Sequence, residues 1–283
     1  MTAIAGGLLG ATLVRLSPGF GVDEREMDTR LSTQSQQWVK SQHAGERNVA
    51  VFYVHYLSGL ARGDFGFSQT LNRPISDLLK ERIPLTLTSL AYGAGLGLAC
   101  GVLLSMLTVL IRSAPLNFLS SGVSGLMLSL PAAVLALLFL WMGSAGRWAI
   151  ALAVFPHAYR YSKNLLVNAR ESSHVVAAQA RGIAPLRILL AHIVAPVIPQ
   201  LGALAGMSII IAFGASIPIE AICDSPGIGQ LAWQAALARD LPVLVTITLL
   251  VAIFTVTVNA LSDLTLAPWS VTDKDNAAIQ GAL

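Results

Sequence analysis

The chain has 283 residues, of which 54% are hydrophobic and 12% are charged, whereas a soluble domain typically carries about 25% charged residues. Its mean hydropathy is +0.67. The 18 basic and 15 acidic residues form no basic cluster, so the composition gives no support to a nucleic-acid-binding protein. We therefore expect a protein that lies in a lipid bilayer.

The apolar residues are gathered into stretches that can cross a bilayer, which takes about 20 residues per helix. Four such stretches contain no Asp, Glu, Lys or Arg: 83–111, 114–146, 188–219 and 241–262. A fifth stretch, 148–159, is short, and we expect it to cross with Arg160 and Lys163 reaching the headgroups at its inner end. Residues 1–16 are apolar apart from Arg15 and lack the features of a signal peptide. We interpret them as a first transmembrane helix, either complete or shortened at its start.

The predicted fold is therefore all-α, with six transmembrane helices and a polar external insert at 17–82. Short loops rich in Lys and Arg stay in the cytosol. The connection between the fourth and fifth spans holds one acid, Glu171, and five basic residues: Arg160, Lys163, Arg170, Arg181 and Arg187. This loop, 168–194, is predicted to be cytosolic, as are both termini. The five-helix core is expected at 83–265, followed by a cytosolic tail at 266–283.

Within the external insert, we predict helices at 27–40 and 49–60. A third short helix is expected at 75–81, because Pro74 precedes it and proline is favoured at helix starts. It would lead into the second span.

The predicted cytosolic loop has the pattern of a helix, a turn and a second helix. A helix is expected up to Arg181, Gly182 can adopt positive φ at the turn, and Pro185 restarts the helix. Ala177 and Ala178 would let this backbone lie close to another surface. On spacing alone, a loop that only returns the chain to the membrane fits equally well.

Glycines in the predicted spans have two interpretations. Gly122, Ser124 and Gly125 match the G-x-S-G of intramembrane serine proteases, with His157 or His192 as a base. We favour a small-residue packing face between helices.

The second span has a similar set of glycines, and for these we also expect close helix approach: Gly93, Gly95, Gly97 and Gly101. No G-x-x-x-x-G-K-[ST] sequence is present, so an ATP site of that kind is not expected. The histidines and cysteines have no metal-ligand spacing, and no metal site is predicted.

Three motifs, in the same order along the chain, resemble the ABC importer permeases of the dipeptide/oligopeptide/nickel family, B-type subunit. The first is Gly63-Asp-Phe-Gly66, Arg73-Pro74 and Glu81-Arg-Ile-Pro-Leu-Thr-Leu. The second is Ala177-Ala178-x3-Gly182 followed by His192, Pro196 and Pro199, which is similar to the EAA loop. The third is Glu220 with Pro226-Gly-Ile-Gly229, then Ala238-Arg-Asp-Leu-Pro.

The resemblance implies a permease subunit in a bacterial cytoplasmic membrane, without an ATPase site of its own. Its implied partners are a second related permease, two cytosolic ATPases that bind ATP and magnesium, and an extracytoplasmic substrate-binding protein. It assigns a set of residues to ATPase coupling: Ala177, Ala178, Gln179, Arg181, Gly182 and His192. It assigns another set to an external gate or turn: Glu220, Pro226, Gly227, Gly229, Arg239 and Asp240.

Val176 stands where the EAA motif has its acidic residue, so small residues and the Gly182 turn would carry the docking. We expect the Gly/Pro turn to be structural and Glu220 to pair with Arg239. Four small polar residues are predicted to line the pathway: Ser89, Ser105, Ser129 and Asn259. The alternative is an ATP-independent carrier or channel that uses Asp263 or Glu220 as an ion site.

Overall fold

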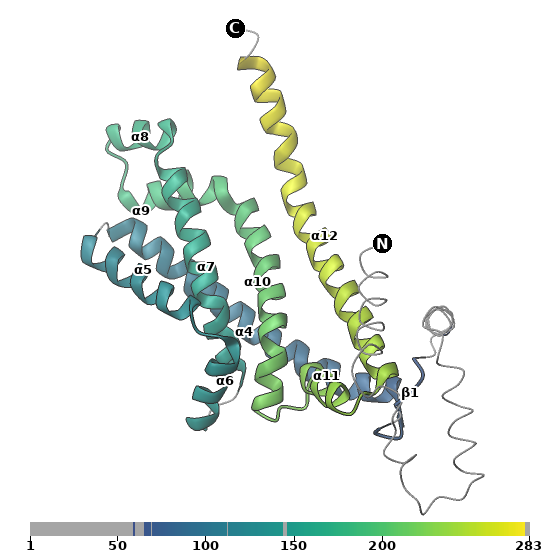
Figure 1. Cartoon of the computed structure of the whole chain (residues 1–283). Coiled ribbons are helices and arrows are strands. Elements are labelled where there is room, and N and C mark those ends of the chain that lie inside the picture. Colours follow the sequence, from purple (N-terminus) through teal and green to yellow (C-terminus); the bar gives the residue numbers. More distant parts are fainter. Residues whose placement is uncertain (1–58, 60–64, 69, 112, 144–145, 281–283) are drawn as a thin grey trace, which may run out of the picture. The chain divides into compact units, whose positions relative to one another are not determined.

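The computed structural model describes residues 59, 65–68, 70–111, 113–143 and 146–280, with the side chains of the last helix described as far as Leu264. The predicted first helix and the predicted helices at 27–40 and 49–60 lie outside these residues. The described part is mostly helical, with a short antiparallel pair of strands, β1 (Phe67–Ser68) and β2 (Arg73–Pro74). The remaining elements are α4 (Ile75–Ile111), α5 (Ala114–Leu128), α6 (Ala132–Trp141), α7 (Gly146–Arg170), α8 (Ser173–Ala180), α9 (Pro185–Arg187), the π-helix η2 (Ile188–Val194), α10 (Ala195–Ile222), α11 (Ile228–Leu237) and α12 (Leu241–Gln280) (Figure 1).

The chain forms two compact units. The first unit combines Met1–Pro84 with Leu231–Phe254, and the second combines Leu85–Gln230 with Thr255–Leu283. Most of the apolar helices belong to the second unit.

Three of the described helices are long and apolar enough to cross a membrane: Ile75–Ile111, Pro185–Ile222 and Leu241–Leu264. These contain the predicted spans 83–111, 188–219 and 241–262. The predicted helix at 75–81 is confirmed, but it is not short, because α4 begins at Ile75 and runs through Pro84 into the second span.

The predicted span 114–146 is not one helix. It divides into α5 and α6, which are bent by 98°. The break lies at Ser129–Pro131, where the Ser129 hydroxyl donates to the Leu126 carbonyl (2.6 Å). Pro131 has no N–H, and it disfavours helical geometry at the residue before it. Pro131 itself is extended at the N-cap of α6, with ψ at 147°.

Glycines bring α4 and α7 into close contact. A Cβ atom at Gly93 would lie 2.5 Å from the Ile150 side chain, one at Gly97 would lie 2.6 Å from the Ala151 carbonyl, and one at Gly101 would lie 2.7 Å from Ala158. The predicted close approach is confirmed at these three glycines, which recur every fourth residue along α4. It is wrong for Gly95, where nothing lies within 4 Å.

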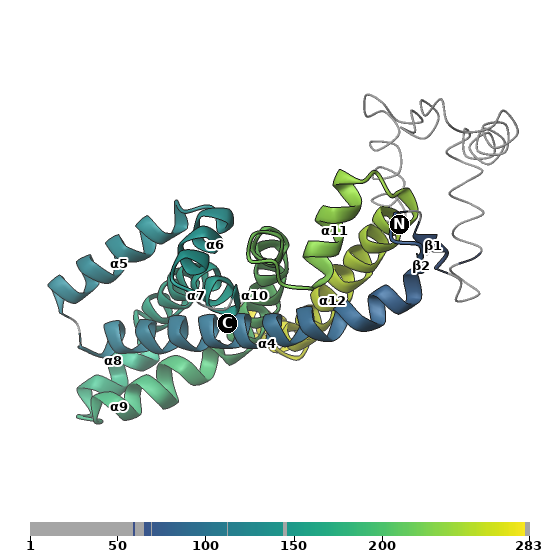
Figure 2. The same ribbon diagram turned by 90° about the horizontal axis from the view of Figure 1, so that it is seen from below.

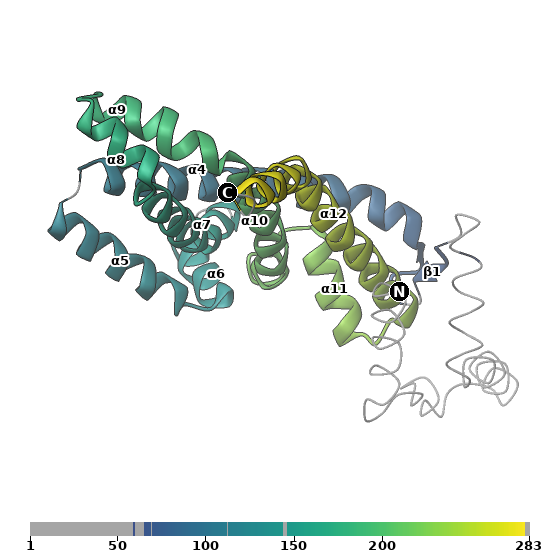
Figure 3. The same cartoon turned by 90° about the horizontal axis from the view of Figure 1, so that it is seen from above.

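The order of these contacts gives the helix directions. Contacts on α7 advance from Ile150 to Ala158 as those on α4 advance from Gly93 to Gly101, so the two helices are parallel. Gly146 at the start of α7 lies against Ile219 near the end of α10, while Leu166 shares a cluster with Ile193 and Val197. Helix α10 is therefore antiparallel to α7. The views from below and above show α7 between α5 and α4 (Figures 2 and 3).

Helix α7 is longer than the predicted stretch 148–159. It has 25 residues and ends at Arg170, which gives a length of about 37 Å at 1.5 Å per residue. Arg160 and Lys163 are therefore not at the end of the helix, and the expectation that they reach the headgroups stays a prediction. The Lys163 ammonium group donates to the Ser121 hydroxyl on α5 (2.8 Å).

Candidate functional sites: an anchored loop and a clamped turn

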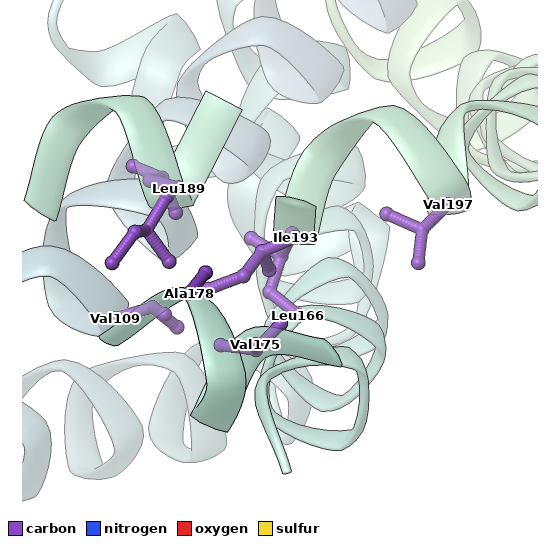
Figure 4. Packing of buried hydrophobic residues seen from close by; sticks show 8 residues of the cluster. Val109, Leu166, Val175, Ala178, Leu189, Ile193 and Val197 are labelled. Atoms are coloured by element: carbon purple, nitrogen blue, oxygen red, sulfur yellow. The ribbon is translucent and has the colours of Figure 1, made fainter. Parts of the chain in front are cut away.

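The helix predicted to couple to an ATPase is attached to the helix bundle by a small apolar core. Val175 is fully buried and Ala178 is 4% exposed, on the face of α8 that points into this core. Figure 4 shows these side chains converging with those of neighbouring helices. The cluster consists of Val109, Leu166, Val175, Ala178, Ile188, Leu189, Ile193 and Val197. The cluster therefore joins α8 to α4, α7, η2 and α10.

The end of α8 is fixed by the turn that the sequence predicts. Gly182 has φ of +71°, in the left-handed region that glycine enters without a Cβ clash. Its N–H donates to the Gln179 carbonyl (3.0 Å), and the Ile183 N–H donates to the Ala178 carbonyl (3.4 Å). This pair of bonds is the Schellman arrangement, which satisfies helix-end carbonyls. Ile183 also packs against the anchoring cluster.

A histidine bond ties α8 to the start of the next long helix. The His174 ring Nε2 lies 3.0 Å from the backbone carbonyl of His192. That carbonyl is available because Pro196, four residues further on, has no N–H to donate. The segment around His192 is the π-helix η2, and π-helical turns commonly mark functional positions. The His192–Pro196 spacing thus has a local structural role.

The predicted coupling residues are divided between the two faces of this element. Ala177, Gln179, Arg181 and Gly182 are exposed, whereas Ala178 is buried. Ala178 therefore anchors α8 and does not belong to its outer surface. Two large apolar side chains are also exposed here, Val176 of α8 at 58% and Leu186 of α9 at 57%.

The Gly/Pro turn after α10 is held by a buried carboxylate. Glu220 is 2% exposed. The Thr86 hydroxyl donates to one of its oxygens (2.9 Å), and the Gly229 N–H donates to the other (2.7 Å). The Ile228 N–H donates in turn to the Thr86 hydroxyl oxygen (2.8 Å). A carboxylate at the N-terminus of α11 is favourable, because free N–H groups and the helix dipole meet there.

Both glycines of the turn are needed for this carboxylate to fit. A Cβ atom at Gly227 would lie 2.2 Å from a Glu220 oxygen, and one at Gly229 would lie 2.6 Å from the Ile217 Cα. Such separations are far below van der Waals contact. These contacts favour the structural interpretation of the turn. The expected pairing of Glu220 with Arg239, which belongs to the other unit, stays a prediction.

In the first unit, Asp240 forms a second carboxylate clamp. It is 2% exposed and accepts hydrogen bonds from the Ser68 hydroxyl (2.6 Å) and the Thr70 N–H (3.1 Å). It also lies at the N-cap of α12, 3.5 Å from the Val243 N–H. Arg239 before it has φ of +55° and ends α11 in a second Schellman arrangement, in which the Asp240 N–H donates to the Ala235 carbonyl (2.9 Å).

The residues predicted to line the pathway lie in different environments. Ser105 is fully buried and accepts a hydrogen bond from Ser162 on α7 (2.9 Å). It fills a contact between two helices, and its place in a pathway stays a prediction. Ser129 and Asn259 are exposed and Ser89 is partly exposed, and their roles stay predictions.

The protease motif has no catalytic geometry among the described residues. The Ser124 hydroxyl is buried and donates to the Ser121 carbonyl (3.0 Å), while the His157 ring lies 3.1 Å from the Ala153 carbonyl. The expected packing face is not seen either, because open space lies beside Gly122 and Gly125. Within the described part of the chain, no group of three His, Cys, Asp or Glu side chains could hold a metal ion.

Sequence reasoning missed the partners of the two carboxylates. Thr86 is part of the first motif and Glu220 of the third, yet they are 134 positions apart. Ser68 and Asp240 are 172 positions apart. The spacing of residues within one motif cannot show that residues of two distant motifs are hydrogen-bonded to each other.

Comparisons with known proteins agree with this architecture. Residues 83–267 match the family described as "Binding-protein-dependent transport system inner membrane component". A protein of Brucella suis that carries the name of a peptide permease is 27% identical, over 90% of this chain and 89% of its own length. The glutathione transport system permease protein of Escherichia coli is 25% identical over 76% of each chain. The oligopeptide transport system permease protein of Haemophilus influenzae is 26% identical over 76% of this chain and 77% of its own. The chain therefore belongs to the family of inner membrane components of binding-protein-dependent transport systems.

Proposed function

We propose that this chain is a permease subunit of an ATP-driven importer for peptides or similar small solutes. The single observation that carries the proposal is the family match over residues 83–267, which includes α8 and its turn. The peptide and glutathione permeases among its relatives support this class of solute. The subunit would form half of the pathway, with a second related permease as the other half and an external binding protein delivering the solute.

The energy would come from two cytosolic ATPases, one of which would dock on the outer face of α8. This face presents Val176, which is 58% exposed, beside the small residues Ala177 and Ala180, and Leu186 of the neighbouring α9 is 57% exposed. An exposed apolar patch on a polar loop is typical of a protein contact site. The basic residues around this loop support a cytosolic position.

Anchoring by the buried face of α8 explains how docking would drive transport. When ATP closes the two ATPases, α8 would move with them, and Val175 and Ala178 would carry that movement into the bundle. Because packed cores shift between discrete arrangements, a small displacement can switch the bundle between inward and outward opening.

The alternative of an ion-coupled carrier gains little from the geometry. The Glu220 carboxylate is buried and already accepts two hydrogen bonds, which is the environment of a structural group. Asp263 is exposed on α12.

The predicted insert at 17–82 would dock the binding protein, and a deletion that keeps full binding-protein affinity would refute that role.

Co-purification tests the proposal. The tagged full chain, expressed with its native partners, should bring along a second permease and ATPase subunits. Val176→Asp places a charge on the docking face and should reduce ATPase recovery about tenfold, since burying a valine side chain contributes about 1.5–3 kcal/mol and a buried unpaired charge opposes binding. Leu237→Asp is the control, because Leu237 is equally apolar and 69% exposed on α11. A chain that purifies alone contradicts the proposal, as does equal ATPase loss in both variants.

A further inference from the structure

The second half of α7 carries polar side chains on its exposed side. His157, Arg160 and Asn164 are all exposed, and their spacing of three and four residues places them on one face of the helix. We refer to these three residues as the α7 stripe. The opposite side of the same half is buried, with Ala158, Tyr159, Ser162 and Leu166 at 0% exposure.

Contacts with α4 fix the depth of this stripe. Gly101 of α4 lies against Ala158, and Ser105 is hydrogen-bonded to Ser162. His157 and Arg160 therefore lie level with the part of α4 between Gly101 and Ser105. That part is inside the charge-free run 83–111 and inside a candidate span. At 1.5 Å per residue, this level is about 9–15 Å from the end of the charge-free run at Ile111.

A cation at this depth requires a polar environment. Ionisable side chains inside a membrane almost always face the bundle interior or a water-filled cavity, because contact with lipid chains is costly. Arg160 is ten residues from the helix end at Arg170, about 15 Å along the helix axis. Helix α7 also contains no Asp or Glu that could neutralise it.

The stripe occupies only one half of the helix. Earlier in α7, no residue from Ala149 to Pro156 is exposed, whereas Arg147 and Trp148 at the start of the helix are exposed. Exposed polar residues return at His157 and continue to Asn164 and Asn168, although Val167 beside them is apolar and 37% exposed. This is the distribution expected of a wetted passage that opens toward the side of α8.

We propose that the α7 stripe lines the inner half of the solute pathway, and that Arg160 attracts an anionic group, such as a carboxylate, on the passing solute. This inference rests on the proposed importer function and names one pathway surface and one solute feature. A contact with the second permease is the other possible use of this face. Close contacts between helices in this chain use glycines, as Gly93, Gly97 and Gly101 do, whereas the stripe presents a cation between two hydrogen-bonding side chains.

Cysteine accessibility tests the water-filled passage. Cys100 and Cys223, the two native cysteines, are first replaced by alanine in the full chain, assembled with its partners in inside-out membrane vesicles. His157→Cys, Arg160→Cys and Asn164→Cys should then react with a membrane-impermeant maleimide at least tenfold faster than Leu103→Cys. Leu103 is the matched control, because it is 64% exposed on α4 between Gly101 and Ser105. Reaction rates equal to the control, both without nucleotide and with ATP, would overturn the proposal.

A second measurement isolates the role of Arg160 without needing the solute. The Asn164→Cys variant is labelled with a sulfonate-bearing and with a trimethylammonium-bearing thiosulfonate. One turn separates positions 160 and 164, about 6 Å, and a unit charge at that range should favour the anionic reagent about fivefold in a partly wetted site. Adding Arg160→Gln should remove the preference. An unchanged preference would refute the anion role. Both measurements are independent of uptake, so their failure is distinguishable from failure of the importer function.

Discussion

Replacing Thr86 with valine tests whether the buried carboxylate clamp stabilises the protein. Thr86 is 1% exposed, and its hydroxyl both donates to Glu220 and accepts from the Ile228 N–H. Valine has a similar shape and can do neither. A hydrogen bond to a charged group contributes about 1.5–3 kcal/mol and a neutral one about 0.5–1.5 kcal/mol. We therefore expect Thr86→Val to lower the free energy of unfolding by about 2–4 kcal/mol.

The assay is thermal unfolding of the purified complex in detergent. A loss of 1 kcal/mol shifts Tm by roughly 2–4 °C in chains of about this size, so Thr86→Val should lower Tm by about 5–10 °C. Thr88→Val is the matched control, because the exposed Thr88 hydroxyl donates only locally, to the Leu85 carbonyl. Its Tm should change little. If the two variants have the same Tm, the hydrogen bonds of Thr86 do not stabilise the protein as the contacts indicate.

A double-mutant cycle extends the same test. Glu220→Gln keeps the shape of the side chain but removes the charge that accepts from Thr86 and Gly229. Because both residues share one network, their effects on the free energy of unfolding should be non-additive by about 0.5–3 kcal/mol. Additive effects would show that the two side chains act separately.

Three further changes probe other parts of the structure. Gly229→Ala should lower Tm, because the new Cβ would lie 2.6 Å from the backbone of α10. Gly95→Ala is the control, since its Cβ meets open space and should leave stability unchanged or raise it by up to about 1 kcal/mol. Equal Tm values for the two variants would contradict this. Asp240→Ala removes the acceptor for Ser68 and should speed protease cleavage beside β1, and an unchanged cleavage rate would argue against the clamp. Gly182→Val should abolish uptake while leaving membrane insertion intact, since φ is +71° there and valine is strained in that region; unimpaired uptake would contradict the coupling role.

The local features of the coupling loop were predictable from sequence. Gly182 is typical of a helix end and Pro185 of a helix start. The structure has a helix on each side of Gly182, which has positive φ. The close approach of α4 and α7 was also predictable, because glycines at every fourth position leave a groove. Pro131 could have predicted the break between α5 and α6. The absence of charged residues from 114 to 146 instead suggested a single helix.

The contacts of individual side chains depend on which helices become neighbours, and the spacing of residues along the sequence does not show this. Glu220 was expected to pair with Arg239, and its partners within the second unit proved to be Thr86 and Gly229. Ala178 looked like a surface residue because it is small, yet it faces the anchoring cluster. Asp224 and Arg239 end helices with positive φ, a position where glycine is the usual signal.

The central claim is that the exposed face of α8 contacts an ATPase, and site-specific photo-cross-linking tests it most directly. A benzophenone side chain replaces Val176, which is 58% exposed on α8, or Trp141, which is 88% exposed at the end of α6. In the assembled complex, the label at 176 should cross-link to an ATPase subunit and the label at 141 should not. A complex that hydrolyses ATP and imports solute, but gives no ATPase cross-link from position 176, would contradict the claim.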